Sequence, residues 1–371
     1  MAGIYVHIPF CKSKCRYCDF ASFPDKLCFA ESYMACVYRE MAMRKEELKS
    51  YTFDTLYIGG GTPSVIDENY IAMLVAAARK NFKLAKDAEI TIEMNPGTVS
   101  AKKIETYLKC GINRFSVGLQ TAVDSQLAEL GRIHNLKEFL LCTKLLKGRN
   151  FSVDVMIGLK NQTLADIEKT IETAAYSGAN HISMYALSPE DGTPIYSDYL
   201  NGELPDGDEV AEMYSSGVKK LRELGFDRYE VSNFSKKGFE SRHNLNYWRR
   251  GDYIGFGVAA SSCINNIRFT NTFDLDEYFK CILSNHLAVK DREEVDLAGQ
   301  EEEFIMLALR TSRGLNLKEY AELFNKNFTE VYAAAIQKVG KYIEVNGDFL
   351  KIKDENLFIQ NSIIVEFLRT E

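Results

Sequence analysis

An apolar run leads directly into three cysteines in the stretch Tyr5-Val6-His7-Ile8-Pro9-Phe10-Cys11-Lys12-Ser13-Lys14-Cys15-Arg16-Tyr17-Cys18. Its apolar part is rich in β-branched and aromatic residues, which predicts a buried strand. Cys11, Cys15 and Cys18 follow on a loop with the spacing C-x3-C-x2-C. Soft thiolates select zinc or an iron-sulfur cluster, and a closed zinc site takes four ligands, usually as two separated pairs. The chain has no second C-x2-C pair, so three thiolates favour a [4Fe-4S] cluster with one iron open to another ligand.

Similar apolar runs recur through the first two-thirds of the chain, and longer helical patterns separate them. Strands are expected at residues 3–8, 53–58, 88–94, 113–118, 151–157 and 180–187, and helices at 25–50, 67–82, 100–110, 135–148 and 163–178. This alternation predicts parallel βαβ units and hence an α/β fold. A partial (β/α)6 barrel is the simplest arrangement of six units. A doubly wound sheet is the alternative, because periodicity does not separate the two.

The last third of the chain has a different pattern. Turn signals at 189–208 precede an expected helix at 208–224 and strand at 226–231, and residues 233–270 are expected to form irregular connections near a site. From about residue 291 the pattern predicts three helices, a short hairpin around Asn346-Gly347 and a final helix, as in a winged-helix module. The predicted domains are a core at 1–235, a connecting segment at 236–290 and a small C-terminal helical domain at 291–371.

Composition excludes several classes of protein. The 371 residues include 45 Lys and Arg against 52 Asp and Glu, and the resulting net charge of −7 excludes a simple basic nucleic-acid binder. The longest apolar run, residues 70–78, is about half of the ~20 residues that a membrane-spanning helix needs, so no transmembrane segment is expected. The N-terminus lacks a basic signal region. The nine cysteines are an odd number and are scattered except for the three at 11–18, which does not fit a secreted disulfide framework. A cytoplasmic location is therefore predicted.

A glycine run, Gly59-Gly60-Gly61-Thr62-Pro63, follows the second expected strand. It matches neither the dinucleotide-binding fingerprint nor a P-loop. Consecutive glycines let the backbone approach a small polar ligand closely, and the alternative is a tight connecting turn.

Polar residues also occur at or near the ends of the later strands. These residues are Glu93, Asn95 and Gln120, together with Asp154 inside the fifth strand. An acid inside an apolar strand is costly to bury unless it has a partner, so Asp154 requires either a ligand or an internal ion pair, for example with Arg132. Taken together, a ring of strand-end groups favours a ligand site.

The cysteine loop in its setting, the glycine run and Glu93-x-Asn95-Pro96-Gly97 resemble the radical SAM superfamily. Within it, the chain resembles the HemN/HemW branch in the motifs Gly118-x-Gln120-Thr121, Gly131-Arg132-x-His134, Tyr229-Glu230-x-Ser232-Asn233-Phe234 and Arg242-His243-Asn244-x-x-Tyr247-Trp248. The resemblance implies that S-adenosylmethionine chelates the open iron and that the glycine run holds its methionine end. It also implies ligand-binding roles for a set of residues: Tyr5, Gly60, Gly61, Thr62, Glu93, Gln120, Arg132 and Asp154.

Two sub-branches differ at one position beside the cluster loop. The oxygen-independent coproporphyrinogen III oxidases carry another cysteine two positions after the third cluster ligand, where this chain has Phe20. The haem-chaperone sub-branch has an aromatic residue there and carries the H-N-x-x-Y-W motif, here residues 243–248. The resemblance therefore favours a protein that binds the cluster, S-adenosylmethionine and haem, and delivers haem to acceptor proteins such as membrane-associated respiratory ones. Whether S-adenosylmethionine is cleaved stays open.

Other assignments remain as alternatives. The first is the oxidase, which decarboxylates coproporphyrinogen III. The second is an electron-transfer protein, which would need a fourth thiolate such as Cys28. One departure from the branch is Lys160, which stands where the family has proline in Gly158-Leu159-Lys160-Asn161-Gln162-Thr163.

His243 is a candidate haem ligand, because imidazole is a common axial ligand of haem iron. Tyr247, Trp248, Tyr253 and Phe256 are candidates for an aromatic lining around it. The alternative is that His243 is a hydrogen-bonding loop residue.

Overall fold

Six parallel strands lie side by side in the order in which the chain makes them. The computed structural model describes residues 2–368. The strands are β1 (Ala2–Ile8), β2 (Thr52–Gly60), β3 (Lys83–Met94), β4 (Arg114–Gln120), β5 (Asn150–Ile157) and β6 (His181–Ala186). A doubly wound sheet reverses its strand order partway, and this one does not within β1 to β6. The prediction of a partial (β/α)6 barrel is confirmed.

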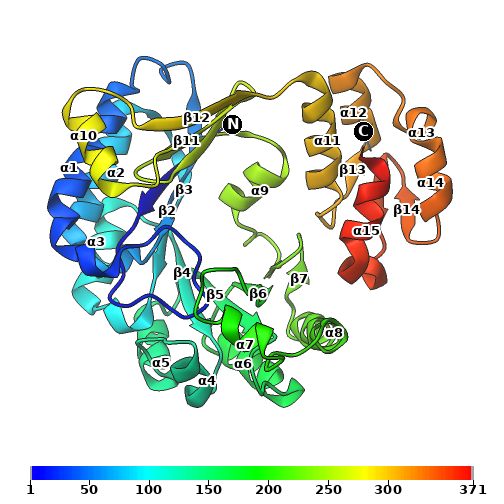
Figure 1. Ribbon diagram of the computed structural model, residues 1–371, viewed down its shortest axis with the longest axis horizontal. Coiled ribbons are helices and arrows are strands. Elements are labelled where there is room, and N and C mark those ends of the chain that lie inside the picture. Colours follow the sequence, from blue (N-terminus) through cyan, green and yellow to red (C-terminus); the bar gives the residue numbers. More distant parts are fainter. Residues whose placement is uncertain (1, 369–371) are drawn as a thin grey trace.

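Helices connect these strands and lie along the outer side of the curved sheet (Figure 1). They are α1 (Ala30–Met43), α2 (Glu68–Asn81), α3 (Ala101–Cys110), α4 (Asp124–Glu129), α5 (Leu136–Leu145) and α6 (Leu164–Tyr176). Four of these helices begin at a side-chain cap: Asp67, Ser100, Asn135 and Thr163 each accept a hydrogen bond from a backbone N–H in the first turn of the following helix. The short α4 was not predicted. The helix expected at 25–50 is instead the 3-10 turn η1 (Pro24–Phe29) followed by α1.

Two smaller strands extend the sheet beyond β6. After α7 (Tyr196–Leu200) and α8 (Gly207–Glu223), β7 (Asp227–Arg228) and β8 (Asn233–Ser235) add to the edge in antiparallel fashion. The strand expected at 226–231 is therefore shorter than predicted.

Residues 233–270, which were expected to form irregular connections, hold regular helices and strands, so that expectation is wrong. The segment holds α9 (Arg242–Trp248), β9 (Asp252–Phe256), β10 (Ser261–Ile264) and β11 (Ile267–Asn271), and α10 (Leu275–Leu283) and β12 (Val289–Glu294) follow. Strand β9 pairs with β1, so the sheet grows to twelve strands in the order β12-β11-β10-β9-β1-β2-β3-β4-β5-β6-β8-β7. A two-residue turn joins β10 to β11, with φ of 51° at Asn265 and 61° at Asn266. Asparagine tolerates this left-handed geometry, which suits a tight hairpin.

The C-terminal module has its own core. It contains α11 (Leu297–Ala308), α12 (Leu317–Phe324), α13 (Phe328–Val331), α14 (Ala333–Val339) and α15 (Gln360–Ile364), with β13 (Leu315–Asn316), β14 (Ile343–Asn346) and β15 (Phe349–Ile352) in a separate sheet ordered β13-β15-β14. Tyr320, Phe328 and Leu350 are at most 1% exposed in its hydrophobic cluster. The helices and hairpin confirm the winged-helix-like prediction. The domain limits at 235 and 290 stay a prediction.

Helix α9 lies between the inner side of the barrel and the C-terminal module (Figure 1). It contacts β1, β2 and β9 on one side and α11 on the other. The site described below therefore has the module as a neighbour. Within residues 2–368, no helix is both long enough and apolar enough to cross a membrane.

Candidate cofactor-binding site

Strand alternation sorts the side chains of the sheet into two faces. Ile4, Val6 and Ile58 are fully buried among the residues of the main hydrophobic cluster. Tyr5 and Tyr57 are cross-strand partners in the alternate positions, with ring centroids 6.3 Å apart. Because successive side chains of a strand point to opposite faces, Tyr5 and Tyr57 lie on the inner face, away from the helices.

The cysteine loop leaves β1 and is held in place by the glycine run of β2. The backbone N–H of Gly61 donates to the carbonyl of Ile8 at 2.9 Å, and that of Thr62 donates to the carbonyl of Phe10 at 2.8 Å. Cys11 Sγ lies 3.4 Å from Thr62 Oγ1. The first thiol and the glycine run therefore form one local structure.

All three thiols of the motif are free and electrostatically coupled. Burial is the main cause that raises the pKa of the Cys11 and Cys18 thiols, and each is raised further by the neighbouring Cys15. A guanidinium nitrogen of Arg132 lies 3.6 Å from Cys15 Sγ. Cys28 lies apart in η1 and is exposed.

The donor set fits a cluster better than a single metal ion. Among residues 2–368, no three His, Cys, Asp or Glu side chains converge on one metal-ion position. A [4Fe-4S] cluster does not require such convergence, because each thiolate binds a different iron. Three free thiols on one loop can each bind a different iron, and a cationic side chain lies beside them. This arrangement therefore suits a [4Fe-4S] cluster.

The glycines of the run are needed for steric reasons. Gly60 has φ of +114°, and a Cβ there would lie 2.6 Å from His7 Nδ1. A Cβ on Gly61 would lie 2.8 Å from the carbonyl oxygen of Phe10 and 3.0 Å from Cys11 Sγ. The space that these missing side chains leave is therefore directly beside the first thiol.

Glu93 ends β3 next to this run. Its carboxylate accepts a hydrogen bond from the Gly60 N–H at 3.0 Å and another from the Tyr57 hydroxyl at 2.8 Å. Burial is the largest cause that raises the pKa of Glu93 to about 7. A carboxylate in this position suits hydroxyl donors of a ligand, since charge-assisted hydrogen bonds are the strong ones.

Gln120, Arg132 and Asp154 gather around Gly118 on the other side of the barrel mouth. Gly118 is the cross-strand partner of Asp154, and a Cβ on it would lie 3.0 Å from both Arg132 Nη2 and Gln120 Nε2. Arg132 donates to the Gly118 carbonyl at 3.0 Å, and Gln120 has φ of 72° at an irregularity of β4. Arg132 thus links this group to Cys15.

Asp154 has hydroxyl partners. Ser116 Oγ lies 3.4 Å from both carboxylate oxygens, and burial is the largest cause that raises the pKa of Asp154. In the part of the chain that the structure describes, no ion pair joins it to Arg132, so the alternative of that internal ion pair is not what the structure has.

The loop that carries Lys160 is closed by Gln162. The Gln162 side chain accepts from the Leu159 N–H at 3.2 Å and donates to the Met156 carbonyl at 3.0 Å. Lys160 forms an ion pair with Glu203 at 2.6 Å. Lysine is therefore accommodated at the surface of this loop without loss of its internal hydrogen bonds.

His7, to which the sequence analysis assigned no ligand-binding role, lines the site. Its Nδ1 lies 3.0 Å from the Tyr5 hydroxyl and its Nε2 lies 2.8 Å from the carbonyl of Ala21. Burial lowers the pKa of His7, which keeps the imidazole neutral. The signal for this role was its place at the C-terminal end of a barrel strand.

His243 is buried below the site, and the geometry favours the hydrogen-bonding alternative over the haem ligand. It is 1% exposed, its Nδ1 lies 2.7 Å from Thr55 Oγ1, and its Nε2 lies 2.8 Å from the Tyr247 hydroxyl. Burial lowers the pKa of His243 to about 3. Neither ring nitrogen is free for an iron in this conformation, so axial ligation by His243 would require one of these hydrogen bonds to break.

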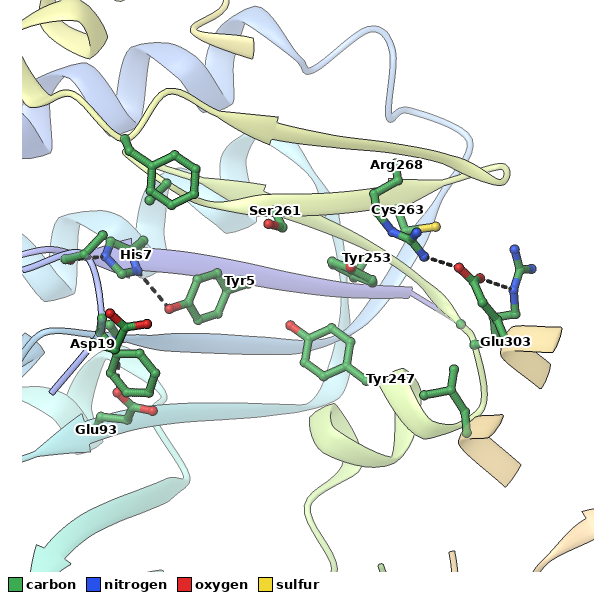
Figure 2. A pocket seen from close by; sticks show the side chains of 18 of the residues that line it. Tyr5, His7, Asp19, Glu93, Tyr247, Tyr253, Ser261, Cys263, Arg268 and Glu303 are labelled. Atoms are coloured by element: carbon green, nitrogen blue, oxygen red, sulfur yellow. Dashed lines mark hydrogen bonds and ion pairs between the residues drawn. The ribbon is translucent and has the colours of Figure 1, made fainter. Parts of the chain in front are cut away.

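A cavity of about 650 Å³ joins the barrel mouth to the C-terminal module. Figure 2 shows Tyr5, His7 and Glu93 at one end of it, Arg268, Cys263 and Glu303 at the other, and Tyr247 and Tyr253 between them. Two strongly exposed aromatic side chains also line it: Phe20 is 67% exposed and Phe273 is 61% exposed. Of the expected aromatic lining, Tyr247 and Tyr253 are present. Trp248 does not line the cavity, and Phe256 is fully buried in the core. Sequence reasoning missed Phe273, Arg268 and Glu303, because no motif marks them.

The fold and the three-thiol loop define the class of protein, that of the radical SAM proteins. Residues 5–174 match the Radical SAM superfamily, and residues 297–359 match the HemN C-terminal domain. Radical SAM proteins use a [4Fe-4S] cluster and S-adenosylmethionine.

Individual relatives identify the family within this class of proteins. The heme chaperone HemW of Bacillus subtilis (strain 168) is 33% identical over 349 residues, which cover 92% of both chains. The heme chaperone HemW of Haemophilus influenzae is 31% identical over 387 residues, covering 100% of this chain and 98% of that relative. The chain therefore belongs to the HemW family of radical SAM proteins. The solved structure of the coproporphyrinogen III oxidase HemN from Escherichia coli superposes with a TM-score of 0.87 over 99% of this chain and 90% of that one, but at 18% identity this likeness shows the fold alone.

Proposed function

We propose that this protein is a haem chaperone. In this proposal Cys11, Cys15 and Cys18 hold a [4Fe-4S] cluster, S-adenosylmethionine binds beside it, and haem occupies the adjoining part of the cavity until an acceptor protein takes it. The names of the HemW relatives support the haem assignment. All nine cysteines are free thiols, which is usual in a reducing compartment, so a cytoplasmic location is part of the proposal.

The residues described above have distinct tasks toward the two cofactors. When bound, the cluster supplies one iron with an open position, which the family fills with the amino and carboxylate groups of S-adenosylmethionine. The glycine run leaves room for the methionine end, and Glu93 accepts hydrogen bonds from ribose hydroxyls. Arg132 offsets the negative charge of Cys15. Three further residues provide polar contacts around S-adenosylmethionine: Tyr5, Gln120 and Asp154.

The cavity that extends from this site to the C-terminal module is the observation that carries the haem proposal. Its volume of about 650 Å³, which includes the space beside Tyr5, Gly60 and Glu93, is within the range of roughly 300 to 1,000 Å³ that small-molecule sites span. Phe20 and Phe273 both line it and are mostly exposed, so their rings are available to an apolar ligand in the cavity. The faces of a porphyrin ring are flat and apolar, so packing them against these aromatic side chains would contribute about 25 cal/mol per Å² of apolar area removed from water.

Phe20 also separates this proposal from the oxidase alternative. In the oxidase branch this position holds an additional cysteine, and a phenyl ring has neither acid-base nor redox capacity. We therefore assign Phe20 to porphyrin binding rather than to chemistry on it. The likeness of the fold to HemN favours neither activity.

The test is a haem titration of the anaerobically reconstituted protein, followed by absorption spectroscopy. Replacing Phe20 or Phe273 by Ala should weaken haem binding, whereas Phe29→Ala should not, because Phe29 is also exposed but does not line the cavity. Equal affinity for haem in all three variants would contradict the proposed location of the haem.

A further inference from the structure

One carboxylate is held between two guanidinium groups at the far end of the cavity. Glu303 of α11 accepts from Arg250 Nε at 2.8 Å through one oxygen and from Arg268 through the other (Figure 2). The three side chains are only partly exposed, at 17% for Arg250, 39% for Arg268 and 19% for Glu303. All three line the cavity.

Within the cavity lining at this end, two guanidinium groups share a single carboxylate, that of Glu303. The other carboxylate near Arg268 is Glu293, which is 67% exposed and lies at 4.0 Å. Arg250 donates a second hydrogen bond to Asn266 at 2.7 Å, and its remaining terminal nitrogen is buried without a partner among the described residues. This end of the cavity therefore has capacity for a further anionic group.

Glu303 also connects two units of the fold. Arg268 belongs to β11 of the large sheet, whereas Glu303 precedes Phe304 and Ile305, which belong to the core of the C-terminal module. A partly buried guanidinium that loses its carboxylate needs another anion, because an unpaired charge there is costly. A carboxylate from a ligand in the cavity would meet that need.

We propose that Arg250 and Arg268 bind the carboxylate groups of the porphyrin. When the cavity is empty, the carboxylate of Glu303 pairs with the two arginines instead. This inference rests on the proposed haem function and adds the way in which the ligand is recognised: apolar cover from Phe20 and Phe273 at one part of the cavity, and a guanidinium pair at the other. Arrival of the ligand carboxylates releases Glu303, and with it the contact between α11 and β11. Departure of haem restores that contact.

The test compares haem with haem dimethyl ester, which has the same ring and iron but no free carboxylates. Binding of both is titrated with the reconstituted full chain. The wild type should bind haem more tightly than the ester, and Arg268→Gln should weaken haem binding roughly 10- to 100-fold with little effect on the ester, as expected for a lost charge-assisted hydrogen bond. Arg268→Lys, which keeps the charge, should retain part of the preference.

Glu303→Gln removes the competing carboxylate and should tighten haem binding without tightening ester binding. The matched control is Glu293→Gln, the same change beside Arg268 but outside the cavity lining, which should leave both affinities unchanged. Cluster content and far-ultraviolet circular dichroism check that each variant is folded.

The outcomes separate this inference from the proposed function. Equal affinity of the wild type for haem and its ester, or unchanged haem affinity in Glu303→Gln, would overturn the guanidinium site and leave haem binding intact. Failure of the wild type to bind either molecule would overturn the haem function itself.

Discussion

The backbone N–H of Gly60 donates a hydrogen bond to the carboxylate of Glu93 at 3.0 Å. These residues belong to two motifs that are 33 positions apart in the sequence, at the ends of the neighbouring strands β2 and β3. The hydrogen bond makes the glycine run and the carboxylate parts of one site. It also fixes the carboxylate beside the loop that carries Cys11.

The first prediction concerns this carboxylate. Glu93→Gln should weaken S-adenosylmethionine binding by roughly 1.5 to 3 kcal/mol, the usual contribution of a charge-assisted hydrogen bond, and should leave the cluster intact. Calorimetric titration of the reconstituted protein measures the first effect and iron analysis the second. Unchanged affinity in the variant would show that Glu93 does not contact the ligand.

The raised pKa of Glu93 gives a second prediction, on pH dependence in the absence of ligands. Because folding raises the pKa of this acid from 4.5 to about 7, the folded state binds the proton more tightly than the unfolded state. The contribution of Glu93 to the free energy of unfolding is therefore greatest at low pH and is lost as the pH rises through this window, by at most about 1.4 kcal/mol per pH unit.

Urea unfolding at pH 5, 6 and 8 measures this effect. The stability of the wild type relative to Glu93→Gln should fall between pH 5 and pH 8. The exposed Glu46→Gln provides the control and should show no such trend. A difference between wild type and Glu93→Gln that does not change with pH would contradict the assigned pKa.

The cluster loop supplies the third prediction. Anaerobically reconstituted protein should hold about four irons, and replacement of Cys11, Cys15 or Cys18 by Ala should abolish stable cluster binding. Cys28→Ala is the control, because Cys28 is an exposed thiol outside the loop. Stoichiometric zinc without uptake of iron would refute the cluster, and loss of the cluster in Cys28→Ala would indicate a fourth thiolate.

His243 gives the fourth prediction, because its two hydrogen bonds indicate a structural role. His243→Ala leaves the hydroxyls of Thr55 and Tyr247 without their buried partner and should lower the free energy of unfolding by about 2 to 4 kcal/mol. The absorption spectrum of bound haem should keep the same iron coordination. The exposed His286→Ala should change neither quantity. An altered iron coordination in His243→Ala alone would restore His243 as the axial ligand.

The sequence was sufficient to predict the barrel and the residues that meet at the end of the cavity beside the cysteine loop. Each of the six strands contains a run rich in β-branched, aromatic or other apolar residues, and most of the motif residues lie at or near strand ends, where a parallel sheet brings side chains from distant positions together. The contacts of Thr62 with Cys11 and of Glu93 with Gly60 follow from that arrangement. Local pattern therefore predicts this part of the site.

The far end of the cavity could not be predicted from local pattern. Strands β9 to β12 are short and carry polar residues, so residues 233–270 read as irregular, although the pair Asn265-Asn266 was a hairpin signal. Arg250, Arg268 and Glu303 meet only because β11 and α11 come together in the tertiary structure. No pattern of residue spacing in the sequence predicts the contact among these three side chains.

A combined assay on one reconstituted sample tests the central claim most directly. The protein is given S-adenosylmethionine and a reductant, and it is then offered haem in one reaction and coproporphyrinogen III in another. The account predicts saturable, stoichiometric binding of haem, with no protoporphyrinogen IX formed from coproporphyrinogen III. Multiple-turnover decarboxylation, or failure to bind haem, would contradict the chaperone assignment and favour the oxidase.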